Sequence, residues 1–385
     1  MSVLTACLQR LGVLAICLLV VSGLAVSEAR AIETTAKAAI LLDAKTGTVL
    51  FEKNADEPLP PSSMSKMMTV YLVFQRLKDG RLSLEDKLLV SQYAWRKGGS
   101  KMFVEEGKEV SIEDLLRGII IQSGNDASIV VAEGLAGSEE AFADEMNEEG
   151  RKLGLTNSHF KNATGWPVEG QVVSARDLSA IALRTIQDFP EYYHYYAEKE
   201  FTYSDIRQTN RNPLLYAMKD ADGLKTGHTE AIGYGLTASA ERDGRRLILV
   251  LNGLPSDRAR AQESQRLLEW GFREFGNYDL FKAGDEVDQA RVWLGMENTV
   301  PLVIGNDLVL TLPRKDRKEM QVSVIYSEPV PAPVVAGAEI AKLVIKIADN
   351  PTVVVPLVAG KSVEQLGFFG RMGAALSYLL WGVSH

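Results

Sequence analysis

The chain has 385 residues, of which 46% are hydrophobic, and its 50 acidic and 42 basic side chains give a formal net charge of −8 at pH 7. An acidic chain without a basic block is a poor nucleic-acid binder, so we expect no nucleic-acid partner. Both cysteines, Cys7 and Cys17, lie in an N-terminal apolar segment, which leaves the rest of the chain without a disulfide, a thiolate metal site or a cysteine nucleophile.

Residues 1–31 have the pattern of a signal peptide that is removed on export. Arg10 precedes an apolar run over residues 11–26, and Ala29 and Ala31 place small residues at the positions that a signal peptidase reads. The alternative is an N-terminal membrane anchor, but the run is shorter than a spanning helix usually needs. We therefore expect an exported chain that begins at Ile32.

The pattern of residues 32–285 predicts an antiparallel sheet with helices around it, an α+β domain. Two strands are expected within residues 38–54, joined by a Lys45-Thr46-Gly47 turn, and a strand pair with an Arg-Asp-Gly-Arg turn is expected within residues 231–254. Between and after them, apolar residues recur at helical spacing in six segments: residues 58–80, 111–121, 126–136, 138–154, 174–189 and 256–276.

From Glu286 the sequence changes to short β-rich runs separated by turn residues, which predicts a small β-sandwich over residues 286–360. The tail, residues 361–385, has an apolar helical stripe that includes Phe369 and Met372, as in helices that lie in a membrane interface. A helix docked on the body of the protein is the alternative. A spanning helix is disfavoured because Arg371 interrupts the apolar run.

Three short motifs could together form a hydrolytic site. Gly-x-Ser-x-Gly and His-Glu-x-x-His are both absent, so a hydrolase would need a base other than histidine. Ser63 and Lys66 are three residues apart at the start of an expected helix and would share a face, where a partly desolvated lysine could take the serine proton. Taken alone, Ser-x-x-Lys is common and usually describes a solvated helix face.

The other two motifs are Ser123-Gly124-Asn125, between two expected helices, and Lys225-Thr226-Gly227 with His228, before the expected strand pair. The first could be a simple helix cap. In the second, glycine allows close approach of the backbone and lysine supplies a cation for a substrate carboxylate. Each motif is weak alone, but this set in this order is the mark of penicillin-binding proteins and class A β-lactamases.

The chain therefore resembles the serine-type D-alanyl-D-alanine carboxypeptidases of the penicillin-binding protein 5 family. The stretches "SKMMT", "LLRGIIIQSGNDA", "LGLTNSHF" and "DGLKTGHTEAIGY" carry the likeness, which extends over the β-rich second domain and the amphipathic tail. The resemblance implies a penicillin-binding, serine β-lactamase-like fold followed by a small β-sandwich and a C-terminal amphipathic helix. It implies no metal or organic cofactor.

The resemblance also implies the roles of individual residues. Ser63 would be the acylated nucleophile, Lys66 its general base, and Ser123 and Asn125 would complete the proton network. The residues that would bind substrate are Lys225, Thr226, Gly227, His228 and Arg260. The oxyanion hole would use the backbone N–H of Ser63 and of His228 or Thr229.

The implied substrate is a peptidoglycan stem pentapeptide, from which the terminal D-alanine is removed, and β-lactams would acylate the same serine. The protein would work at the periplasmic face of the inner membrane, held there by residues 362–385. The sequence departs from the family over residues 95–107, in "NATGWP" and in "NRNP", so the deacylation rate and the peptide preference are not carried over.

Three other functions are open. A β-lactamase would share the acylation step, but no Glu-x-x-Leu-Asn stretch follows the second motif. An endopeptidase that cuts D-alanyl crosslinks is chemically close. A catalytically silent wall-binding protein is disfavoured by the intact motif residues, and failure to react with penicillin would identify it.

Overall fold

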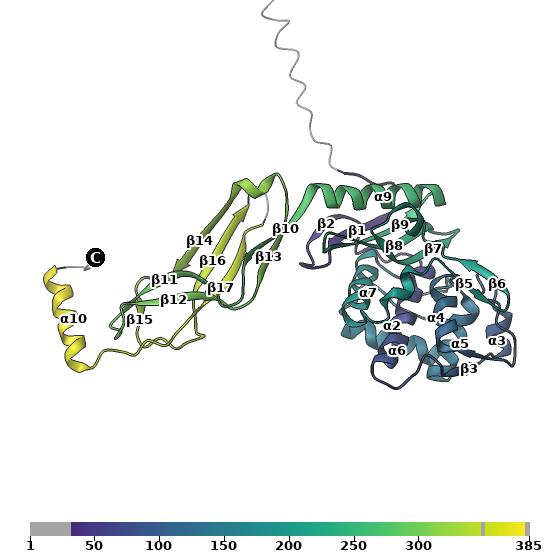
Figure 1. Cartoon of the computed structure of the whole chain (residues 1–385), viewed down its shortest axis with the longest axis horizontal. Coiled ribbons are helices and arrows are strands. Elements are labelled where there is room, and N and C mark those ends of the chain that lie inside the picture. The colour runs from purple at the N-terminus through teal and green to yellow at the C-terminus, as the bar shows by residue number, and fades with distance from the viewer. Residues whose placement is uncertain (1–31, 348–350, 382–385) are drawn as a thin grey trace, which may run out of the picture. The chain divides into compact units, whose positions relative to one another are not determined.

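The computed structural model describes residues 32–347 and 351–381 (Figure 1). The signal peptide predicted over residues 1–31 lies outside the described residues. Within the described part, one apolar core forms around helices and a sheet before residue 275, and a separate one forms among the strands that follow.

A five-stranded antiparallel sheet with the order β2-β1-β9-β8-β7 organises the first of these parts. Strand β1, an interior strand, is buried at all six positions, as expected for a strand that is covered on both faces. Asp243 and Gly244, both at positive φ, form the predicted turn between β8 and β9. The strands are β1 Ala38–Asp43, β2 Val49–Lys53, β7 Ala221–Thr229, β8 Gly233–Arg242 and β9 Arg245–Leu254.

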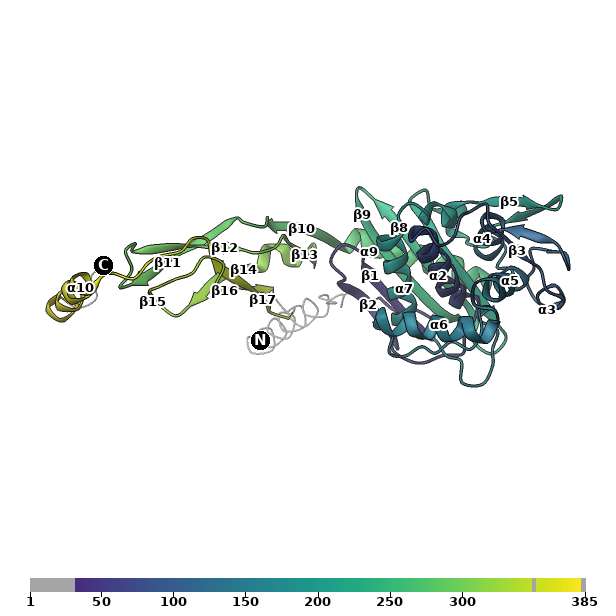
Figure 2. The ribbon, with the colours of Figure 1, turned by 90° about the horizontal axis from the view of Figure 1, so that it is seen from below.

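Helices cover both faces of this sheet, with α9 (Asp257–Glu274) above it and the others below (Figure 1). Seen from below, the lower helices lie in front of the strands (Figure 2). They are α2 Lys66–Lys78, α4 Ile112–Ile120, α5 Asn125–Ala136, α6 Glu139–Lys152 and α7 Ala175–Asp188. Buried Phe74, Phe142 and Phe160 belong to the apolar core here.

Serine caps set the first residue of four of these helices. Ser111, Ser138, Ser174 and Ser256 each accept a hydrogen bond at 3.0–3.1 Å from the backbone N–H three residues later. Because each serine is followed by an amphipathic pattern, the predicted helical segments that contain it start close to where the structure starts them.

Short elements complete this part. They are α3 Gln92–Arg96, α8 Leu214–Ala217, the strand pairs β3 Lys87–Leu89 with β4 Glu109–Ser111 and β5 Glu200–Tyr203 with β6 Ile206–Thr209, and the 3-10 turns η2 Ser63–Ser65 and η3 Tyr193–Ala197.

The second part is built from β-strands, as predicted from the sequence. Six strands form a sheet with the order β14-β16-β17-β12-β11-β15, and β10 pairs with β13. β10 precedes the domain boundary expected at residue 286 and follows α9 directly. The elements are β10 Phe275–Phe281, β11 Glu286–Trp293, β12 Thr299–Ile304, β13 Leu308–Pro313, η4 Asp316–Glu319, β14 Met320–Tyr326, β15 Val330–Pro331, β16 Glu339–Ile347 and β17 Val353–Ala359.

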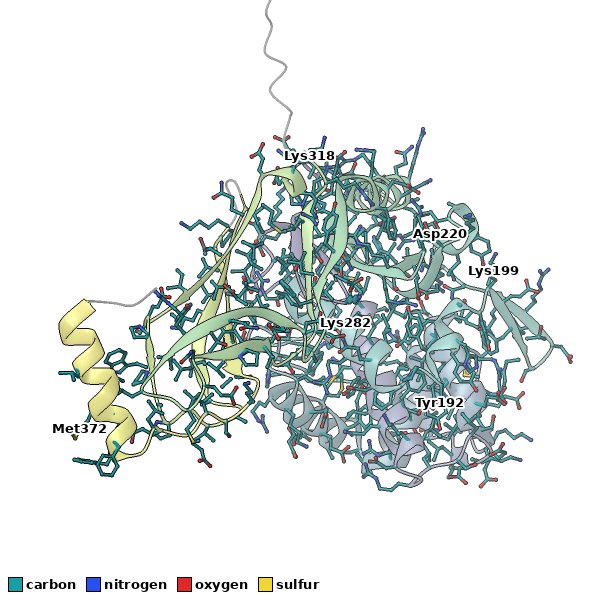
Figure 3. All side chains as sticks on the ribbon, turned by 60° about the vertical axis from the view of Figure 1, so that its left-hand side comes forward. Tyr192, Lys199, Asp220, Lys282, Lys318 and Met372 are labelled. Carbon is teal, nitrogen blue, oxygen red and sulfur yellow. The ribbon has the colours of Figure 1, made fainter. Side chains whose placement is uncertain are left out.

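The predicted tail helix is α10, Phe368–Trp381. Its Phe369 is 84% exposed and its Met372 is 56% exposed. Figure 3 shows Met372 on the outside of this helix. Among the described residues, no helix is long and apolar enough to cross a membrane.

Candidate active site

Lys66 lies at the centre of the site and uses all three of its donors. Its side chain is fully buried, and Nζ donates to Ser63 Oγ at 3.1 Å, Asn125 Oδ1 at 2.8 Å and the carbonyl of Thr164 at 2.6 Å. Ser63 stands in the 3-10 turn η2, directly before α2, and Lys66 is the first residue of that helix. Three residues of separation therefore place the hydroxyl and the amine in contact.

The surroundings of Lys66 favour its neutral form. Burial, followed by the charges of Arg211 and Lys97, lowers the pKa of this amine from 10.5 to about 7, against the raising effect of Asp126 and Glu139. At neutral pH a substantial fraction of Lys66 can therefore accept a proton from Ser63.

The second motif occupies the connection between α4 and α5. Ser123 is held at φ +64°, in the left-handed region, and its Oγ is buried without a hydrogen-bond partner among the described residues. Asn125 accepts from Lys66 through Oδ1 and donates from Nδ2 to the carbonyl of Gly98 at 2.9 Å. The amide thus joins the base to the loop over residues 97–104.

Asp126, which follows the motif, fixes the same loop. Its carboxylate accepts the backbone N–H groups of Met102 and Phe103, both at 3.0 Å, and that of Ala127 at 2.9 Å. The carboxylate is buried, and these hydrogen bonds compensate for its loss of water.

The third motif lies on β7. Lys225 is 2% exposed, and burial, then the charges of Lys66, Arg211 and Arg260, hold the pKa of its amine well below its usual value. A side chain at Gly227 would place its Cβ 2.0 Å from Ser62 Oγ, so only glycine lets β7 lie this close to the residue before Ser63.

His228 and Arg260 are linked through Tyr234. The His228 and Tyr234 ring centroids are 4.1 Å apart, and the Arg260 guanidinium lies 5.7 Å from the Tyr234 ring. Arg260 is buried and pairs with Asp257, whereas the neighbouring Arg258 is exposed. Burial lowers the pKa of Arg260 despite that carboxylate.

Arg211 is a residue of the site that the sequence analysis missed. Its Nη1 donates to Ser100 Oγ at 2.7 Å, and its charge acts on Lys66, Lys225 and Arg260. Asn212 Nδ2 donates to the carbonyl of Gly223 at 2.7 Å and so ties this segment to β7. The available signal was the arginine between two asparagines in "NRNP", which the analysis treated as a local difference.

The loop that supplies the Thr164 carbonyl was also missed. Asn162 Oδ1 accepts the backbone N–H groups of Thr164 at 3.2 Å and Trp166 at 3.1 Å, and the Thr164 hydroxyl at 2.9 Å. Gln171 Oε1 accepts the N–H of Asn162 at 2.9 Å. Such a network predetermines where the Thr164 carbonyl meets Lys66.

The earlier Lys-Thr-Gly triplet is a structural turn, as the sequence analysis concluded. Asp43 Oδ1 accepts the backbone N–H groups of Lys45 at 3.0 Å and Thr46 at 3.2 Å, and Gly47 has φ +71°. The Lys45 amine pairs with Asp279 at 3.0 Å.

A cleft of about 610 Å³ opens above Ser63. It is lined by Ser63, Gly99, Ser100, Asn125, Thr164, Gly165, Trp166, Pro167, His228, Thr229, Glu230 and Ala231. The arrangement combines a serine hydroxyl, a buried amine that can accept its proton, and a group of cations suited to an anionic ligand.

Comparisons with known proteins agree with this geometry. The sequence model of the family described as "D-alanyl-D-alanine carboxypeptidase" matches residues 25–255, and that of "Penicillin-binding protein 5, C-terminal domain" matches residues 275–365. The chain is 41% identical over 345 residues to D-alanyl-D-alanine carboxypeptidase DacC of Escherichia coli, covering 88% of this chain and 86% of that one.

Solved structures show the same likeness. Penicillin-binding protein 5 from Haemophilus influenzae superposes with a TM-score of 0.79 at 35% identity, over 87% of this chain and 99% of that one. D-alanyl-D-alanine carboxypeptidase DacD from Francisella tularensis superposes with a TM-score of 0.78 at 31% identity, over 87% and 95%. The similarity therefore extends over both parts of the fold.

Proposed function

Because this chain belongs to the D-alanyl-D-alanine carboxypeptidase family and is a penicillin-binding serine hydrolase of the penicillin-binding protein 5 type, we propose that Ser63 is the residue it acylates. The observation that carries this assignment is the buried Lys66 amine, which touches Ser63 Oγ at 3.1 Å and has a pKa of about 7. A serine hydroxyl needs such a base to attack a carbonyl at neutral pH.

In the acylation step, neutral Lys66 takes the proton of Ser63 while Oγ bonds to the carbonyl carbon between the two terminal D-alanines. The N–H groups of Ser63 and of His228 or Thr229 would stabilise the oxyanion. The carbon–nitrogen bond then breaks, and the leaving amine needs a proton. The buried Ser123 hydroxyl, which has no partner among the described residues, is suited to pass that proton on from Lys66.

Water completes the reaction. It attacks the acyl carbon, a proton returns to Ser63 Oγ, and the shortened peptide leaves. Asn125 would hold Lys66 in place through both steps, because its amide is itself fixed to the carbonyl of Gly98.

We assign the terminal carboxylate of the substrate to the cationic end of the site. Lys225 and Arg260 are both buried, and Arg211 adds a third positive charge to the group. Thr226 and His228 would contribute hydrogen bonds from β7. Desolvated cations of this kind bind a carboxylate more strongly than solvated ones.

The test is intact-protein mass spectrometry with and without benzylpenicillin, followed by peptide mapping. We expect a stoichiometric adduct on Ser63 and none in Ser63→Ala, with loss of D-alanine release from a D-alanyl-D-alanine peptide in the same variant. No adduct on the folded wild-type protein, or an adduct that maps to another residue, would contradict the assignment.

We also propose that the exported protein consists of a peptidase domain over residues 32–285, a β-rich domain over 286–360 and a tail over 361–385 that lies on the periplasmic face of the inner membrane. The support is the apolar surface that α10 presents to solvent: Phe368, Phe369, Met372 and Leu376 are 64%, 84%, 56% and 59% exposed. An interfacial helix buries such a surface among lipid headgroups.

A further inference from the structure

The cleft above Ser63 contains a single carboxylate among its lining residues. Of the two titratable side chains other than the nucleophile that line it, His228 lies on β7 and Glu230 follows that strand. The cations of the site are Lys66, Lys225, Arg211 and Arg260, and they serve the catalytic and carboxylate-binding steps. Glu230 has no role in either step.

Glu230 is placed at the edge of the cleft by the turn between β7 and β8. β7 ends at Thr229 and β8 begins at Gly233, and Thr229 Oγ1 accepts the N–H of Ile232 at 3.3 Å within the turn. Along an extended strand, the five steps from Lys225 to Glu230 span about 16 Å. This separation puts Glu230 well away from Lys225, which lies in the middle of β7.

The Glu230 side chain is exposed, and it forms no hydrogen bond or ion pair with any residue in the described part of the chain. The charge of Lys97, which precedes the lining residues Gly99 and Ser100, is engaged by aromatic rings. The Lys97 amine lies 5.6 Å from the ring of Tyr93 and 5.5 Å from that of Trp166. Glu230 is therefore available to a ligand.

A second segment of the cleft lining is held in place by hydrogen bonds. It consists of Thr164, Gly165, Trp166 and Pro167, and the hydrogen bonds of Asn162 hold this loop. Trp166 is 45% exposed. An aliphatic side chain lying on the Trp166 ring would bury apolar surface in the same cleft that Glu230 lines.

We propose that Glu230 determines substrate specificity by binding a protonated amine on the residue that precedes the two D-alanines of the acyl donor. The inference rests on the proposed function and, within it, on a terminal carboxylate that lies at Lys225 in the middle of β7, with Arg260 reaching it from beside Tyr234. The acyl part of the peptide must then leave Ser63 in the other direction, along β7 toward the turn. A carboxylate and an alkylammonium group form a charge-assisted hydrogen bond there.

The test compares two peptides that differ only in this charge: Nα-acetyl-L-lysyl-D-alanyl-D-alanine with a free side-chain amine, and the same peptide with that amine acetylated. The readout is the ratio of kcat/KM for the two, from D-alanine release by the full mature chain. For a solvent-accessible ion pair we expect wild type to favour the free amine by about fivefold. In Glu230→Gln the ratio should fall to about one, and in Glu230→Lys below one.

Glu169→Gln is the matched control, because Glu169 is an exposed carboxylate on the loop of Trp166 that does not line the cleft. It should keep the wild-type ratio. A wild-type kcat/KM ratio of one, or an unchanged ratio in Glu230→Gln, overturns the inference about Glu230. In that case, a benzylpenicillin adduct on Ser63 would still support the proposed function. If wild type neither forms that adduct nor releases D-alanine from either peptide, the proposed function fails, and this inference fails with it.

Discussion

Replacing Arg211 with glutamine should shift the pH dependence of Ser63 acylation to higher pH. Lys66 accepts the serine proton only when it is neutral, and the positive charge of Arg211 is the largest electrostatic contribution to the low pKa of Lys66 after burial. Without that charge the ammonium form is less disfavoured, so the pKa of Lys66 rises. The reactive fraction at a given pH below the new midpoint falls accordingly.

The size of the effect follows from the midpoint. With a pKa of about 7 for Lys66, the neutral fraction is about 9% at pH 6 and about 91% at pH 8, so the acylation rate should rise about tenfold between them. Each unit by which Arg211→Gln raises the pKa of Lys66 lowers the rate at pH 6 by about a further tenfold. At pH values well above both midpoints the ratio of the two rate constants should become independent of pH, because it then reflects only the contribution of Arg211 to carboxylate binding.

The assay is the second-order rate constant for acylation by benzylpenicillin, measured from pH 5.5 to 9.5, because that constant reports the free enzyme. Two variants separate charge from contact. Arg211→Lys keeps the charge, and Ser100→Ala keeps the charge while it removes the hydrogen-bond partner of Arg211. Both should retain a midpoint near that of wild type.

The midpoint of the pH–rate profile, rather than the absolute rate, shows whether Arg211 acts through the pKa of Lys66. If Arg211→Gln has the wild-type midpoint and is only slower by a constant factor, Arg211 does not act through the pKa of Lys66. If Ser100→Ala shifts the midpoint as far as Arg211→Gln does, the hydrogen bond matters and the charge does not.

Three further predictions concern stability and location. Lys225→Met removes a buried cation from a group of like charges, so Tm should rise by about 2–4 °C. Acylation by benzylpenicillin should slow about a hundredfold. A lower Tm by calorimetry would contradict the expected stabilisation. Asp126→Ala leaves four backbone N–H groups without their acceptor and should lower the free energy of unfolding by about 2–3 kcal/mol in urea titrations. An unchanged midpoint would mean that water replaces the carboxylate. Deleting residues 367–385, which spares the buried Val363, should abolish cosedimentation with anionic lipid vesicles and leave Tm unchanged; continued binding would place the membrane contact elsewhere.

The local part of the site could be predicted from the sequence. Ser63 and Lys66 are close because three residues separate them at a helix start, and the position of Asn125 after an apolar helix brings its amide to the same point. The roles of Ser123, Lys225 and the other site residues were predicted from the resemblance to a known family, which the order of the three motifs revealed. The structure adds that Ser63 belongs to a 3-10 turn before α2, a detail that helical periodicity cannot resolve.

The contacts made by distant segments could not be predicted in the same way. Lys66 donates to a backbone carbonyl of residue 164, and any residue type there has such a carbonyl, so the sequence carries no mark of the contact. Arg211 acts through its charge from a segment that only the fold brings near. Likewise, the pairing of β10 with β13 depends on strands about thirty residues apart, and the domain division remains a prediction.

The close fit around Ser62 limits how a bacterium could evolve resistance at this target. The strand that carries Gly227 approaches Ser62 from one side, and a side chain at Gly165 would place its Cβ 2.1 Å from the carbonyl oxygen of Ser62. A bulkier residue at Gly227 or Gly165 would obstruct an antibiotic only by displacing the chain next to Ser63. The same displacement would abolish the carboxypeptidase activity. Substitutions at these two glycines are therefore not a route to resistance by steric exclusion. Resistance substitutions are expected instead at the exposed rim of the cleft, where Trp166 and Glu230 can change without moving Ser63.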